Sequence, residues 1–173
     1  MSGLRVFLDA NELIRLALGF HGDARPAQLA LERLEVSGDP IAVIMLVAAS
    51  GESVNGQHLV ICSSVRTLSL AKAKLAEVYR WEPELLDEFI RLVVQLVLKS
   101  QGTVLRGAAS PRLYGLLQDR EDCHRLAEAH TCDAELFVTE DQEILGAWAS
   151  DPTLRPIAIS ARSFVDLMRS GRS

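Results

Sequence analysis

The stretch Leu4-Arg5-Val6-Phe7-Leu8-Asp9, near the start of the 173-residue chain, is a short apolar run that ends on an aspartate. A run of this length and composition is typical of a buried strand. The next stretch, 11–18, has the apolar spacing of a helix, and Gly19 ends it. A strand that leads directly into a helix is a unit of parallel-sheet folds. We therefore expect a strand that carries Asp9 at its carboxyl end.

Two further groups of acids occupy similar places. The stretch 135–139 is predicted as a strand and leads into Thr139-Glu140-Asp141, while Asp119 and Asp122 open a helix predicted over 121–130. In open α/β sheets the functional crevice lies beyond the carboxyl ends of the strands. The sequence therefore predicts that Asp9, Asp122 and Asp141 converge on one crevice.

The rest of the chain continues the alternation of strands and helices. Helices are expected at 26–34, 64–80, 83–99 and 162–168, and strands at 58–62, 103–105 and 156–160. The stretch 41–50 is rich in Val and Ile and precedes the turn-forming residues 51–56, which favours a hairpin or a strand–loop–strand arrangement. This order predicts an α/β sandwich with a mainly parallel central sheet, formed as a single domain over 1–173.

Bulk properties narrow the class of protein. A hydrophobic content of 49% argues against disorder, and the net charge of −5 argues against nucleic-acid binding through bulk positive charge. The three cysteines, an odd number without framework spacing, are expected to be reduced, buried thiols in a cytoplasmic protein. The longest apolar run, 41–49, is too short for a membrane helix, so we expect a soluble protein.

Clustered carboxylates raise one another's pKa unless a cation neutralises them, and hard oxygen ligands favour Mg²⁺ or Mn²⁺ over zinc. The alternative is that each aspartate merely caps a helix or belongs to an ordinary turn. Zinc is disfavoured because the spacing of Cys123, His124, His130 and Cys132 matches no zinc-site pattern. Four arginines could contact RNA phosphates, although we interpret them as a scattered solvated surface: Arg106, Arg112, Arg120 and Arg125.

Several stretches together resemble the PIN-domain nucleases. The stretches 6–14 and 136–145 are similar to the opening and closing motifs of that family. Between them, 119–122 followed by 126–129 resembles its third motif, and 157–167 looks like its last strand and helix. The resemblance covers essentially the whole chain, with an extended middle segment at about 40–75. It implies a three-layer α/β/α sandwich with a mainly parallel central sheet.

The resemblance also implies an activity. Members of the family hydrolyse RNA with Mg²⁺ or Mn²⁺, so Asp9, Asp122 and Asp141 would be the catalytic metal ligands. Asn11, Thr139 and Asp119 would support them by hydrogen bonds. The family includes toxins of toxin–antitoxin pairs, which implies an RNA substrate, an antitoxin protein as a possible partner, and a homodimer.

One position departs from the family pattern. The family places a glutamate on the helix after the second strand, and in the best-fitting register that position is Lys74. Glu77 lies close to one helical turn further on, so it could supply the missing metal ligand. If Lys74 takes the position, its ammonium would compete with a metal ion. The alternative function is then a catalytically degenerate PIN fold that acts as a binding or regulatory module.

A third possibility is a receiver-like or phosphatase-like α/β domain that uses Asp9. The phosphatase version is disfavoured because the residue two positions beyond Asp9 is Asn11, where such enzymes usually carry a second aspartate.

Overall fold

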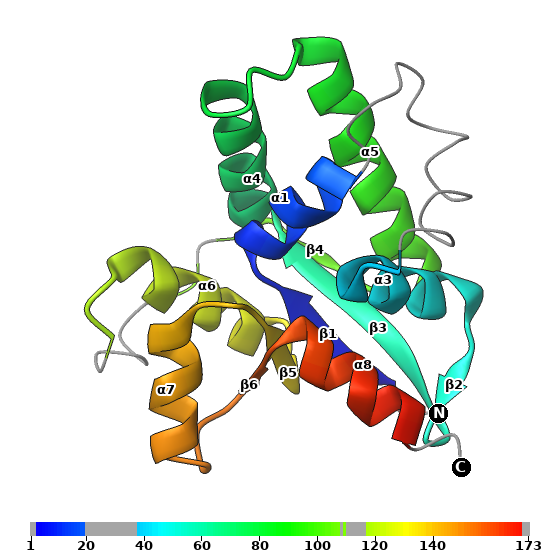
Figure 1. Ribbon diagram of the computed structural model, residues 1–173, viewed down its shortest axis with the longest axis vertical. Coiled ribbons are helices and arrows are strands. Elements are labelled where there is room, and N and C mark those ends of the chain that lie inside the picture. The colour runs from blue at the N-terminus through cyan, green and yellow to red at the C-terminus, as the bar shows by residue number, and fades with distance from the viewer. Residues whose placement is uncertain (1–2, 20–37, 108, 110–116, 171–173) are drawn as a thin grey trace.

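A computed structural model describes residues 3–19, 38–107, 109 and 117–170 (Figure 1). The helix predicted over 26–34 and the basic residue Arg112 lie outside these residues. Within them, strands and helices alternate, and the fold is α/β with a mixed, mostly parallel sheet that curls into a half-barrel. The predicted α/β class and the mainly parallel sheet are confirmed.

The sheet is built around β1 (Leu4–Leu8), which pairs in parallel with β3 (Gln57–Ser64) on one side and β5 (Leu136–Val138) on the other. Beyond β5 lies the parallel strand β6 (Ile157–Ile159), and β2 (Ser53–Val54) runs antiparallel to β3. The short strand β4 (Val104–Leu105) pairs in parallel with the carboxyl end of β3, at Ser63 and Ser64. Because β1, β3 and β5 run in parallel, their carboxyl ends face the same edge of the sheet.

Seven helices accompany the sheet among the described residues (Figure 1). The N-terminal part of the chain contributes α1 (Ala10–Gly19), α3 (Pro40–Ser50), α4 (Val65–Glu77) and α5 (Pro83–Lys99). The C-terminal part contributes α6 (Arg120–Thr131), α7 (Gln142–Ser150) and α8 (Ala161–Ser170). Helices α4 and α5 pack against each other at the top of the view in Figure 1. None of these helices is long and apolar enough to cross a membrane.

Two buried clusters pack on alternate residues of the strands. Val6 and Leu8 belong to a large cluster with residues of α1, α3, α4, α5 and α8. Phe7 points the other way, because successive side chains of a strand alternate between its faces, and belongs to a cluster with residues of α6 and α7. Its ring stacks on that of Phe137, with centroids 6.0 Å apart. Helices thus bury both sides of β1.

The prediction of a strand over 41–50 is wrong, because this stretch forms helix α3. The side chain of Asp39 caps the helix by accepting a hydrogen bond from the Ile41 N–H at 2.8 Å, and Pro40 occupies the first turn. Gly51 ends the helix with a left-handed φ of 72°. The run shows no alternation of apolar and polar residues at helical spacing because the helix is largely buried. Ile41 and Ile44, for example, are inaccessible to solvent.

The remaining expected elements within the described residues are present, with shifts of a few residues at their ends. The largest of these shifts is at the end of the helix predicted over 64–80, which the structure ends at Glu77. The three cysteines are buried and form no disulfide with one another, as predicted.

Candidate active site at the carboxyl edge of the sheet

Most of the buried polar side chains of the described residues lie at one edge of the sheet. Asp9 follows β1, Ser64 ends β3, and Thr139 follows β5, all at the carboxyl ends of parallel strands. Helix α6 adds three buried charged residues spaced three positions apart: Asp122, Arg125 and Glu128. Residues at this spacing share one face of a helix. Burial of so many polar groups requires that they bind one another.

Asp9 is fully buried at the centre of this edge. Its backbone carbonyl accepts hydrogen bonds from the N–H groups that begin α1, so the residue joins β1 to that helix. On its side chain, Oδ2 accepts a hydrogen bond from Thr139 Oγ1 at 2.7 Å, and Oδ1 accepts one from Arg125 Nη1 at 2.5 Å. Both carboxylate oxygens are therefore held in place by other elements of the fold.

Asp122 meets Asp9 at the same arginine. It lies in the first turn of α6, is 3% exposed, and accepts a hydrogen bond on Oδ1 from Arg125 Nη2. The guanidinium of Arg125 thus binds one oxygen of each aspartate. The structure therefore brings together two of the three predicted catalytic aspartates, which are far apart in the sequence.

Asp141 is linked to this pair through Thr139, and its side chain makes no hydrogen bond or ion pair with Arg125 among the described residues. Its Oδ1 caps α7 by accepting hydrogen bonds from the N–H groups of Glu143 at 2.9 Å and Ile144 at 3.2 Å. Its own N–H donates to Thr139 Oγ1 at 3.1 Å. The Thr139 hydroxyl therefore connects the Asp9 side chain to the Asp141 backbone. The simpler role considered for Asp141, that of a helix cap, is present in the structure.

Asp119 also acts as a helix cap. Its Oδ1 accepts a hydrogen bond from the Glu121 N–H at 2.7 Å at the start of α6. It supports Asp122 by fixing the first turn of the helix that carries it.

The resemblance to PIN-domain nucleases predicts that Lys74 stands where those proteins have a glutamate. Lys74, on α4, donates a hydrogen bond from Nζ to Asn11 Oδ1 at 3.2 Å. Asn11 thereby pairs with the lysine, and no hydrogen bond links it to an aspartate within the described part of the chain. Glu77 is exposed at the end of α4 and makes no hydrogen bond or ion pair with the described residues.

Sequence reasoning missed the role of Arg125, which it interpreted as part of a solvated surface. The residue is only 8% exposed. Its position three residues after Asp122 was a usable signal, because the two share a helix face with the apolar side chains of α6.

Glu128 was also missed as a buried polar group. Its Oε2 accepts hydrogen bonds from Ser64 Oγ at 2.6 Å and Thr67 Oγ1 at 3.3 Å. Burial raises the pKa of the Glu128 carboxyl, an effect that these two hydroxyl groups oppose. Glu128 therefore ties α6 to the start of α4.

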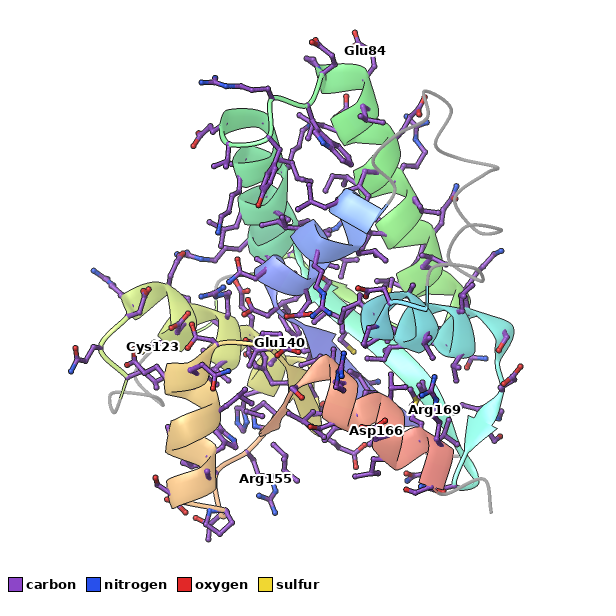
Figure 2. All side chains as sticks on the ribbon, in the orientation of Figure 1. Glu84, Cys123, Glu140, Arg155, Asp166 and Arg169 are labelled. Atoms are coloured by element: carbon purple, nitrogen blue, oxygen red, sulfur yellow. The ribbon has the colours of Figure 1, made fainter. Side chains whose placement is uncertain are left out.

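A second acidic group lies beside Asp9, on α1. Glu12 is 1% exposed, and burial, followed by the nearby Glu140, raises its pKa to about 7. The counter-charge is Arg15, whose Nη1 lies 3.9 Å from Glu12 Oε2 and which also pairs with Asp39 and Glu140. Glu140 lies near the start of α8, where it accepts a hydrogen bond from the Ala161 N–H (Figure 2).

The chemistry of the donors fits a hard divalent cation. Asp9 and Asp122 present carboxylate oxygens to one buried point, which is the type of ligand that Mg²⁺ and Mn²⁺ prefer. That point already attracts a cationic group, the guanidinium of Arg125. In the residues that the structure describes, no three His, Cys, Asp or Glu side chains are arranged as a ready group for a metal ion.

Neither a family model, nor a curated protein, nor a solved structure matches the chain.

Proposed function

We propose that this protein is a divalent-metal-dependent endoribonuclease with the three-layer α/β/α sandwich of the PIN domains. The observation that carries the proposal is the convergence of Asp9 and Asp122 at the carboxyl edge of the parallel sheet. Two buried carboxylates at one point repel each other strongly and need a cation. The site also lies where α/β sheets hold their ligands.

In this proposal Asp9 and Asp122 hold Mg²⁺ or Mn²⁺, which supplies polarisation of the phosphate and a more acidic bound water. The chain contributes rigid placement. Thr139 fixes one oxygen of Asp9, while Asp119 fixes the helical turn that carries Asp122. Asp141 Oδ1 is bound to the start of α7, so only its second oxygen would be left to contact the ion.

The test is cleavage of structured and unstructured RNA by the full chain with Mg²⁺, with Mn²⁺ and with chelator. Asp9→Asn and Asp122→Asn should each lower the rate to the level measured in chelator, because an amide does not replace the anionic ligand. Asp166→Asn is the matched control, since Asp166 is exposed on α8 (Figure 2). Cleavage by both site variants at the rate of the parent protein would sink the proposal.

The resemblance alone supports the partners that belong to this proposal: an RNA substrate, an antitoxin protein and a second copy of the chain. Light scattering after size exclusion measures the oligomeric state. Co-expression with the product of an adjacent small reading frame tests for an antitoxin.

A second candidate function, a metal-free binding or regulatory module, is favoured by the two basic groups at the edge. Arg125 binds both aspartates, and Lys74 stands where the resemblance predicts a glutamate. Calorimetric titration with Mn²⁺ separates the candidates. Binding that Asp9→Asn abolishes supports the nuclease, and the absence of any binding supports the module.

A further inference from the structure

The guanidinium of Arg125 lies where a cation between Asp9 and Asp122 would have to lie. Nη1 binds Asp9 Oδ1 at 2.5 Å, and Nη2 binds Asp122 Oδ1. The arginine side chain is 9% exposed, and the two carboxylate side chains are 0% and 4% exposed. Water therefore screens these charges weakly, and one cationic group holds two anionic ones together.

The arginine is incompletely satisfied in this position. Its Nε is buried and has no hydrogen-bond partner among the described residues. A buried donor without a partner carries the free-energy cost of its lost hydration. The guanidinium also gives one nitrogen to each aspartate instead of binding a single carboxylate with two parallel hydrogen bonds, which is its strongest arrangement.

The charges are unequal as well. Two carboxylates carry two negative charges and Arg125 carries one positive charge, so the trio keeps one net negative charge, whereas a divalent cation in the place of the guanidinium would balance both carboxylates. A divalent ion held between Asp9 and Asp122 would take the place of the guanidinium, and like charges at one buried point repel. Binding of one therefore requires the other to leave.

We propose that Arg125 is an internal counter-ion that competes with a divalent cation for Asp9 and Asp122. The proposal rests on the metal site of the proposed function and adds that the site is self-inhibited. In the metal-free protein the arginine holds the two carboxylates in place. A divalent ion binds only to the fraction of molecules in which the guanidinium has moved away, so its apparent affinity is lowered by that fraction.

The test is calorimetric titration of the full chain with Mn²⁺ in the absence of RNA. Arg125→Ala and Arg125→Gln should bind Mn²⁺ about tenfold more tightly or better than the parent chain, because the competing state is removed. Arg120→Gln is the matched control. Arg120 is exposed on the same helix, and its substitution removes the same charge as the Arg125 substitutions. This variant should bind Mn²⁺ like the parent.

Thermal unfolding gives a readout that does not depend on activity. In chelator the Arg125 variants should unfold at a lower temperature than the parent, because their carboxylates lose the counter-ion. Mn²⁺ should raise their unfolding temperature by more than that of the parent. If a variant is unfolded in chelator, Mn²⁺ should restore its fold, and failure to do so contradicts the proposal.

The outcomes separate this proposal from the proposed function. If Asp9→Asn abolishes Mn²⁺ binding but the Arg125 variants bind no more tightly than the parent, the metal site stands and competition is overturned. Loss of Mn²⁺ binding in folded Arg125 variants also overturns it, since Arg125 would then position the carboxylates. Mn²⁺ binding that neither Asp9→Asn nor Asp122→Asn changes, or no binding by any chain, contradicts both proposals.

Discussion

Glu12 is a buried carboxyl surrounded mainly by other carboxyls. Burial raises its pKa most; Glu140, Asp9 and Asp39 raise it further, while Arg15 alone lowers it, so the pKa reaches about 7 from an ordinary 4.5. Between these two values the folded chain holds a proton that the unfolded chain has lost. The contribution of Glu12 to stability is therefore complete below pH 4.5 and is lost as the pH rises through 7.

We expect Glu12→Gln to remove this pH dependence. At pH 8 the parent chain contains a buried, charged carboxylate, so the variant should be more stable by about 1–3 kcal/mol. At pH 4.5, the unfolded-state pKa, the two chains should differ little. Urea denaturation at several pH values measures the difference.

The control for this substitution is Glu84→Gln. Glu84 is exposed in the first turn of α5, far from Glu140 (Figure 2), and its variant should follow the pH profile of the parent. If the difference in free energy of unfolding between the Glu12 variant and the parent is constant from pH 4.5 to 8, the folded chain does not keep Glu12 protonated over this range, which contradicts the prediction.

At the scale of residues, sequence reasoning located the aspartates better than the groups that bind them. Asp9 and Asp141 were visible because each follows an apolar run. The role of Arg125 depends on its contact with Asp9, which belongs to a segment far away in the sequence and is brought close only by the fold. No local pattern shows that a charged residue is buried when its partner is supplied by the tertiary fold.

At the scale of elements, two glycines have opposite requirements. A Cβ added at Gly102, just before β4, would lie 1.7 Å from the carbonyl oxygen of Ile61, which belongs to β3. A Cβ added at Gly146, inside α7, would meet nothing within 4 Å. Gly102 is thus required by close approach of two backbones, whereas Gly146 is only a weak point of its helix.

We expect Gly102→Ala to destabilise the fold by about 2 kcal/mol or more, since backbone must shift to accept the methyl group. Gly146→Ala, the matched substitution, should stabilise the fold by about 0.5–1 kcal/mol because alanine is the better helix former. Thermal unfolding of the two variants measures both effects. Equal stability of the two variants would contradict the close approach at β4.

Helix α3 shows why the type of an element, helix or strand, was harder to predict than the order of the elements along the chain. Its sequence, rich in Val and Ile, is typical of a strand. The end signals were nevertheless present, with Asp39-Pro40 before the run and Gly51 after it. In a fully apolar segment periodicity does not separate a buried helix from a strand, so the capping residues are the better guide.

At the scale of the whole molecule, the two buried clusters share the same strands. Each contains one of the two tryptophans: Trp81 belongs to the larger cluster and Trp148 to the smaller. Loss of either cluster exposes one side of β1 and β5. We therefore predict that both clusters unfold in one transition, as expected for a single domain.

The single-tryptophan variants Trp81→Phe and Trp148→Phe test this directly. In each variant the remaining tryptophan reports on its own cluster by fluorescence during urea denaturation. The midpoint measured by fluorescence should equal the midpoint measured by circular dichroism of the same variant. A fluorescence transition that precedes the loss of secondary structure in either variant would show that the clusters unfold separately.

The α/β class and the parallel sheet were predictable because strands and helices alternate along the chain. The antiparallel edge strand β2 lies within the segment 51–56, which was predicted as a turn. The strand was not predicted because two residues show no periodicity. The exact partners of Asp9 depend on the order β3-β1-β5, which places Thr139 beside it. That order arises from tertiary packing.

The central position of β1 has a consequence for how the candidate site is lost and regained. Strands at an edge of a sheet, such as β6, exchange their amide hydrogens through local fraying, whereas β1 has a partner on each side. Asp9 follows β1 and donates its own N–H to Val138 of β5. Its geometry therefore depends on the pairing of β1 with β5, so we expect the site to be lost when the interior of the sheet opens and to survive the fraying of β6.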